Sequence, residues 1–251
     1  MKKGEKKRQA RQEKKRVGRQ EARQSARAEA HGLVARLARD AARYPLVGCW
    51  VQVGWDQSGM ALATVARRLP VGGILYAKVA VDLYCMGVKN ALTDVVESEE
   101  RWRNQVLPRI YEPQGGSVEV DADLAHQLLY GAVDYAARWG FRPHRAFATA
   151  QRLLDPRSAH PDTGRVTFGY QGKPFYIQGP YDKAKVVVEQ LRRTAGEGNF
   201  DYLLMVGEGD TPLSTGLVGE LLEGDDAQEY WDEDADLDEE APDDGPDLAP
   251  E

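Results

Sequence analysis

The chain has 251 residues and two cysteines, and it has no long uncharged apolar run. The longest apolar run, Ile74–Met86, contains Lys78 and Asp82 and is too short to span a bilayer, and two cysteines cannot supply a disulfide framework. The net charge of −7 is uneven: residues 1–30 carry 12 Lys and Arg against four Glu, whereas residues 221–251 carry 15 Asp and Glu and no cation. We therefore expect a soluble cytoplasmic protein with reduced thiols and no membrane partner.

The basic arm, residues 1–30, has no aromatic side chain. Its Arg, Lys, Gln, Glu and Ala residues favour helix, but it has no apolar stripe through which packing could hold it. We expect this arm to be helical or disordered. After it, Leu33, Val34 and Leu37 recur at helical spacing, which predicts a helix that ends before Pro45.

Three strands joined by short turns are predicted next. Side chains alternate between apolar and polar or small over residues 47–55, and further strands are predicted over Met60–Leu69 and Ile74–Met86. The intervening turns contain Asp, Ser, Gly and Pro. This order predicts an antiparallel meander.

Helices are predicted for the middle of the chain. Ser98 can cap a short helix that Pro108 closes, and Asp121 or Asp123 can cap a longer, amphipathic helix that ends near Gly140. A further helix is predicted from Pro143 to about Leu154, because proline is favoured in a first helical turn.

A second group of strands is predicted in the last third. Alternating residues 166–170 and 175–177 flank the pair Gln171-Gly172, which predicts a hairpin. A helix is expected over Tyr181–Thr194, a buried strand over Asp201–Val206, and a short final helix over residues 213–222.

These elements predict the α+β class, with a mixed, largely antiparallel sheet of about six strands covered by helices. The predicted organisation is a basic arm over residues 1–30, a single globular domain over residues 31–222 and an acidic disordered tail over residues 223–251.

The leading functional hypothesis is a non-enzymatic interaction module. Cations on a flexible arm neutralise phosphates without reading base sequence, and the arm has no aromatic residue for base stacking. We expect contact with nucleic acid or a ribonucleoprotein through Lys6, Lys7, Arg8, Lys14, Lys15, Arg16 and Arg19. The acidic tail is expected to modulate that contact or to bind a basic protein partner.

Two alternatives stay open at this point. In the first, the chain is a metal-dependent nuclease-like enzyme with an RNase-H-like core, in which Asp56 and Asp82 hold divalent ions. In the second, it is a scaffold protein whose charged arms serve only solubility.

The four histidines, His31, His126, His144 and His160, do not show the spacing of a metal-binding motif. No phosphate-binding loop and no nucleophile elbow is present. No metal site is therefore predicted, and no cofactor is expected apart from a divalent metal under the nuclease hypothesis.

Overall fold

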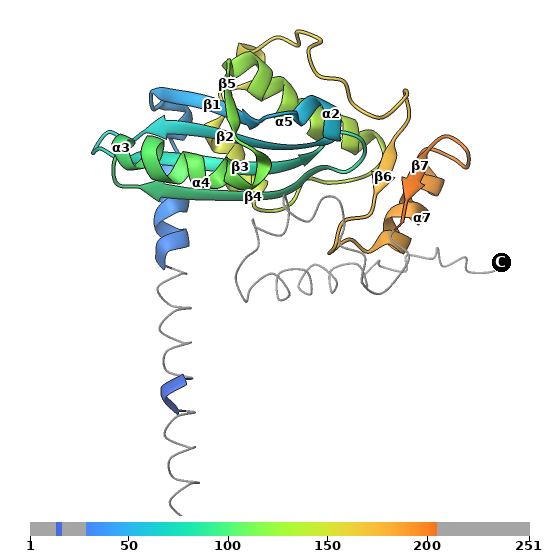
Figure 1. The fold of residues 1–251 in the computed structure, drawn as a ribbon, viewed down its shortest axis with the longest axis horizontal. Coiled ribbons are helices and arrows are strands. Elements are labelled where there is room, and N and C mark those ends of the chain that lie inside the picture. The colour runs from blue at the N-terminus through green and yellow to red at the C-terminus, as the bar shows by residue number, and fades with distance from the viewer. Residues whose placement is uncertain (1–13, 17–28, 205–251) are drawn as a thin grey trace, which may run out of the picture.

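The computed structural model describes residues 14–16 and 29–204. In these residues, helices cover both faces of a five-stranded antiparallel sheet (Figure 1), which confirms the predicted α+β class. The strands are β1 (Leu46–Gln52), β2 (Met60–Arg68), β3 (Ile74–Asp82), β4 (Gly87–Val96), β5 (Ser117–Val120), β6 (Phe175–Ile177) and β7 (Asp201–Leu203). The longer helices are α5 (Ala122–Arg138) and α7 (Ala184–Thr194), together with an unlabelled helix over residues 29–38.

Several short helical segments connect these elements. The single turns of α-helix are α2 (Trp55–Ser58), α3 (Glu99–Arg101), α4 (Leu107–Tyr111) and α6 (Phe147–Ala150). The 3₁₀ turns are η1 (Ala41–Arg43), η3 (Glu112–Gln114), η4 (Gln151–Leu153) and η5 (Arg157–Ala159), and η2 (Trp102–Val106) is a π-helical turn.

The five strands lie in the order β4-β3-β2-β1-β5, and every neighbouring pair is antiparallel. The meander predicted for the first three strands is confirmed as β1, β2 and β3. The first strand is shorter than predicted, because residues 55–58 form the turn α2. Strands β4 and β5 were not predicted.

A turn that begins at Asp82 explains why β4 was missed. The Asp82 carboxylate accepts hydrogen bonds from the backbone N–H groups of Tyr84, Cys85 and Met86 at 2.8–3.1 Å, and this reverses the chain inside the apolar run. The turn stays apolar because later segments cover it, so Leu83 and Cys85 are both buried. The prediction of one long strand to Met86 is therefore wrong.

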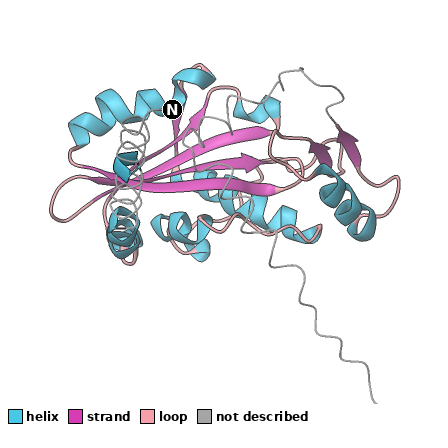
Figure 2. Cartoon of the chain, turned by 90° about the horizontal axis from the view of Figure 1, so that it is seen from below, coloured by secondary structure: helices cyan, strands magenta, loops and turns pink. Residues whose placement is uncertain are grey.

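The two faces of the sheet carry separate apolar cores. On one face, β-strand residues such as Val51 and Val79 pack against α5, α6 and the helix over residues 29–38. On the other face, Trp50, Leu62 and Tyr76 pack against Trp102 and its neighbours in η2 and α4. Figure 2 shows the sheet between these two helical layers. Alternate residues of the central strands lie in opposite cores, because successive side chains of a strand point to opposite faces of the sheet.

The predicted helix starts at Ser98 and Asp121 are confirmed. The Ser98 hydroxyl accepts from the Arg101 N–H at 3.1 Å, and the Asp121 carboxylate accepts from the Leu124 N–H at 2.7 Å. Pro108 does not close the first of these helices. It lies in the first turn of α4, where a missing N–H is tolerated, and the chain stays helical through η2 into α4. Only α6 and η4 form in the segment predicted to be helical from Pro143 to Leu154.

The last third of the described chain departs furthest from the prediction. Tyr170 and Lys173 do form a tight turn, but β6 pairs in parallel with β7, and α7 connects them. The predicted hairpin is therefore wrong. Val166 and Phe168 alternate because they pack against the core beside α5, without strand pairing. The strand predicted to be buried, β7, is exposed at all three of its residues.

The remaining predictions concern residues outside the described ranges. They include most of the basic arm, the helix over residues 213–222, the domain boundary at residue 222 and the acidic tail. None of the helices described is both long enough and apolar enough to cross a bilayer. Cys49 and Cys85 are both free and buried, and burial raises the pKa of the Cys49 thiol to about 12.

Candidate functional site

Asp56 and Asp82, the residues of the nuclease hypothesis, have very different surroundings. Asp56 is exposed in the turn α2. Asp82 is buried, and both of its carboxylate oxygens accept backbone hydrogen bonds within the turn after β3. A carboxylate whose oxygens accept backbone hydrogen bonds in this way stabilises a turn. The geometry therefore gives no support to a shared metal site at these two residues.

The predicted nucleic-acid-binding residues fall partly within the described chain. Lys14, Lys15 and Arg16 are helical and exposed. The other four, Lys6, Lys7, Arg8 and Arg19, lie outside the described residues. The helix over residues 29–38 is anchored through Val34 and Ala38, and its exposed side carries Arg36.

A different group of side chains, not predicted from the sequence, comes together beside α5. We call His126, Asp155 and His160 the histidine cluster. One ligand atom from each of the three residues lies within 4.8 Å of the others, and the centroids of the two imidazole rings lie 3.9 Å apart, with the ring planes inclined by 30°. His126 is buried on α5, whereas Asp155 and His160 are half-buried in the segment that follows η4.

Each imidazole is held by contacts at both ring nitrogens. In His126, Nδ1 lies 3.1 Å from the Ala122 carbonyl oxygen, and Nε2 lies 3.1 Å from the Asp155 carbonyl oxygen. In His160, Nδ1 lies 2.5 Å from the Asp123 carboxylate, and Nε2 lies 3.1 Å from the Asp155 carboxylate. The other carboxylate oxygen of Asp155 accepts from Arg67 at 2.7 Å.

These surroundings separate the pKa values of the two histidines. Burial, together with the nearby His160, lowers the pKa of His126 to about 4. Partial burial also acts to lower the pKa of His160, but hydrogen bonds to Asp123 and Asp155 together outweigh it and raise that pKa above its ordinary value. Near pH 7, His126 is therefore neutral.

Polar contacts attach the segment around His160 to α5. Thr163 donates to the Gln127 side chain at 2.8 Å, and Arg165 pairs with Asp121 at 2.8 Å. Arg157 pairs with Asp134 and lies over the ring of Tyr130, 4.3 Å from its centroid. The position of His160 beside α5 is thus set largely by polar and charged groups.

Sequence spacing could not reveal the histidine cluster. His126 lies on a long helix and His160 lies in an irregular segment far along the chain, so no motif of three to five residues joins them. One sequence signal was available: Asp123, His126 and Gln127 put polar groups close together beside the apolar stripe of an amphipathic helix, where buried polar groups would require a partner segment.

A second buried charged group joins the C-terminal segment to the sheet. Lys89 in β4 donates to Asp182 at 2.6 Å, and their side chains are only 5% and 3% exposed. Asp182 also accepts from the Gly179 N–H at 2.8 Å. Burial raises the pKa of Asp82, and the positive charge of Lys89 acts in the opposite direction. Lys89 therefore forms an ion pair with the buried Asp182 before α7, and its positive charge also stabilises the carboxylate of Asp82 in the turn after β3.

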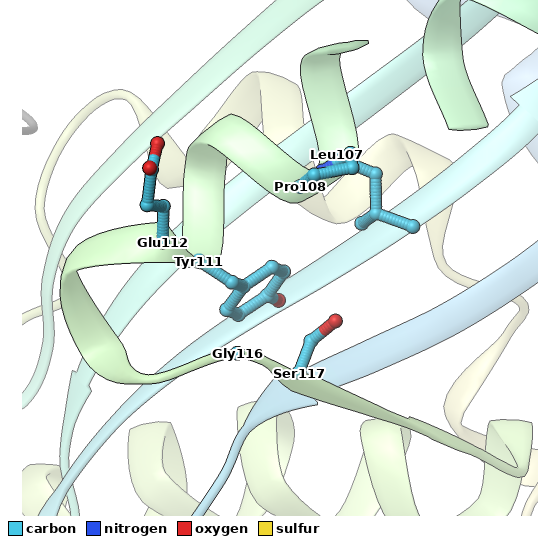
Figure 3. A pocket seen from close by; sticks show the side chains of 6 residues that line it. All are labelled: Leu107, Pro108, Tyr111, Glu112, Gly116 and Ser117. Carbon is cyan, nitrogen blue, oxygen red and sulfur yellow. The ribbon is translucent and has the colours of Figure 1, made fainter. Parts of the chain in front are cut away.

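A shallow pocket lies between α4 and β5. It is lined by Leu107, Pro108, Tyr111, Glu112, Gly116 and Ser117 (Figure 3). The Tyr111 hydroxyl is already engaged in the core, 2.8 Å from Thr64 Oγ1 and 2.9 Å from the Trp50 carbonyl oxygen. Glu112 points away from the other labelled side chains (Figure 3). This lining has no histidine, cysteine or lysine to act as base or nucleophile beside Ser117, so it does not form a catalytic arrangement.

No protein-family model, no curated protein and no solved structure matches the chain. The functional proposals therefore depend on the charge, contacts and chemistry of its own residues.

Proposed function

We propose that the protein is a cytoplasmic interaction module that binds nucleic acid or a ribonucleoprotein through its basic arm. The observation that carries the proposal is the segregation of charge: 12 of the 33 Lys and Arg residues lie in residues 1–30 beside only four Glu. Such a segment neutralises phosphates and releases condensed counterions without reading bases. The exposure of Lys14, Lys15 and Arg16 supports the proposal, because these cations are accessible to a ligand.

The test is the salt dependence of binding to a labelled generic duplex, measured by fluorescence anisotropy. For the wild-type chain we expect log K to fall linearly with log salt concentration, by about 0.9 per phosphate neutralised. Changing all seven predicted arm residues to Gln should flatten this dependence and weaken binding at low salt. The variants are Lys6→Gln, Lys7→Gln, Arg8→Gln, Lys14→Gln, Lys15→Gln, Arg16→Gln and Arg19→Gln.

A matched control distinguishes the effect of the cations in the arm from the effect of a change in net charge alone. The triple variant Lys14→Gln, Lys15→Gln and Arg16→Gln should weaken duplex binding. The control triple variant, Lys183→Gln, Lys185→Gln and Arg193→Gln, removes three exposed cations beside or within α7 and should leave duplex binding nearly unchanged. Equal effects of the two triple variants would contradict a specific role for the arm. Binding that ignores salt would also contradict it, and a chain that binds no polyanion would favour the scaffold alternative.

The acidic tail is proposed to compete with phosphate for the same cations. Residues 221–251 carry 15 Asp and Glu, enough to offset the +8 of the arm. Deleting residues 223–251 should therefore tighten duplex binding at low salt, and the gain should shrink as salt screens the charges. An unchanged affinity after the deletion would contradict competition by the tail, but it would not contradict duplex binding by the arm.

A further inference from the structure

We infer that His126, Asp155 and His160 form a binding site for a late first-row divalent cation, and that Zn²⁺ fits this donor set best. Two imidazoles and one carboxylate, without thiolate, make a ligand set that zinc accepts, with further positions open to water or a backbone oxygen. The spacing of the histidines does not predict this site, because its residues meet only in the tertiary structure.

The strongest argument concerns the lone pairs of His126. A neutral imidazole carries one N–H, but both ring nitrogens of His126 lie 3.1 Å from carbonyl oxygens, those of Ala122 and Asp155. Whichever nitrogen is protonated, the other turns its lone pair towards an oxygen lone pair. A cation near Nε2 and Asp155 would remove this repulsion.

The contacts around the cluster are those of a metal site with ordered outer partners. Asp123 accepts from Nδ1 of His160 and orients its ring, so a cation that replaced the Nε2 proton would lie between Nε2 and the Asp155 carboxylate. The Ala122 carbonyl can orient the ring of His126 in the same way through Nδ1. Arg67 holds one oxygen of Asp155, and the other faces His160. All three ligands are thus oriented by groups that would not themselves touch the ion.

Closing the site requires only a small movement. Tetrahedral zinc with bonds of about 2.0–2.1 Å places its ligand atoms roughly 3.4 Å apart. The three ligand atoms already lie within 4.8 Å of one another. Two of the three ligands belong to the segment after η4, which polar contacts attach to α5. A bound ion would therefore fasten this segment to α5.

The test is Co²⁺ titration of the metal-stripped, full-length protein, followed by visible absorption. We expect one equivalent of Co²⁺ to give the intense d–d bands of four-coordinate cobalt, and one equivalent of Zn²⁺ to abolish them. Zn²⁺ should also slow trypsin cleavage after Arg157 and Arg165, since both flank His160 in the segment that the ion would fasten. The acidic tail supplies only oxygen ligands, which favour weakly absorbing six-coordinate cobalt.

Two variants make the assignment specific. His160→Ala, in the irregular segment, should lower Co²⁺ affinity at least about 100-fold, and Asp123→Asn should lower it about 10-fold through the orientation of His160. The matched controls are Asp56→Asn, which removes an exposed carboxylate in α2, and His31→Ala, which removes an exposed histidine in the helix over residues 29–38. Neither control should change the affinity. The absence of four-coordinate bands, or bands that survive in His160→Ala, would overturn the inference.

Discussion

Lys89→Met is expected to lower the free energy of unfolding by about 3–5 kcal/mol, because it removes the cation from two buried carboxylates. The side chains of Lys89 and Asp182 are 5% and 3% exposed and lie 2.6 Å apart. The positive charge of Lys89 also stabilises the buried carboxylate of Asp82, together with three backbone N–H groups. A methionine fills similar volume but leaves both carboxylates without their counter-charge. Urea unfolding followed by circular dichroism measures the loss.

The control is Lys185→Met, the same change at an exposed position of α7, which should alter stability by less than about 0.5 kcal/mol. The double variant Lys89→Met, Asp182→Leu should recover part of the loss, because removing both partners of a buried pair is less harmful than removing one. If Lys89→Met and Lys185→Met destabilise equally, the pair does not hold the C-terminal segment to the sheet.

Arg67→Met is expected to cost about 3–4 kcal/mol, because one buried guanidinium joins three segments of the chain. In β2, Arg67 donates to the Leu153 carbonyl oxygen at 2.6 Å, to the Tyr44 carbonyl oxygen at 2.8 Å and to Asp155 at 2.7 Å. Its side chain is 4% exposed. Methionine would leave these acceptors without a donor in a place that water hardly reaches. Thermal unfolding of the metal-free protein measures the effect.

The neighbouring residue provides the control. Arg68 pairs with Glu99, but its side chain is 55% exposed, so Arg68→Met should cost less than about 1 kcal/mol. The loss of stability for Arg67→Lys should lie between those for Arg68→Met and Arg67→Met, since an ammonium cannot reproduce the planar guanidinium that donates to several acceptors at once. A loss for Arg68→Met as large as that for Arg67→Met would contradict the role of Arg67 as a buried link.

Local sequence patterns predicted the elements whose structure depends only on residues close to them in the sequence. The helix cap at Asp121 depends on an N–H three residues away, and the alternation in β1 depends on a period of two residues. Both could be recognised before the fold was known. β4 could not, because the turn at Asp82 is covered by a distant segment and its apolar side chains look like a continuing strand.

The histidine cluster shows the same limit for function. His126 is one of several polar residues on an amphipathic helix until the segment after η4 places Asp155 and His160 beside it. Conversely, the charge of the basic arm can be read directly from the sequence, because long-range electrostatic attraction depends on the number of cations and little on side-chain geometry.

The amino-acid sequence alone therefore determined the α+β class, the order of β1, β2 and β3, the starts of the helices at Ser98 and Asp121, and the opposed charges of the two ends. The tertiary structure decided where Asp82 turns the chain, which strand β6 pairs with, and which polar groups meet beside α5. Periodicity and charge are properties of neighbouring residues, whereas a buried turn, a parallel pairing and a three-residue site require segments that meet only when the chain has folded.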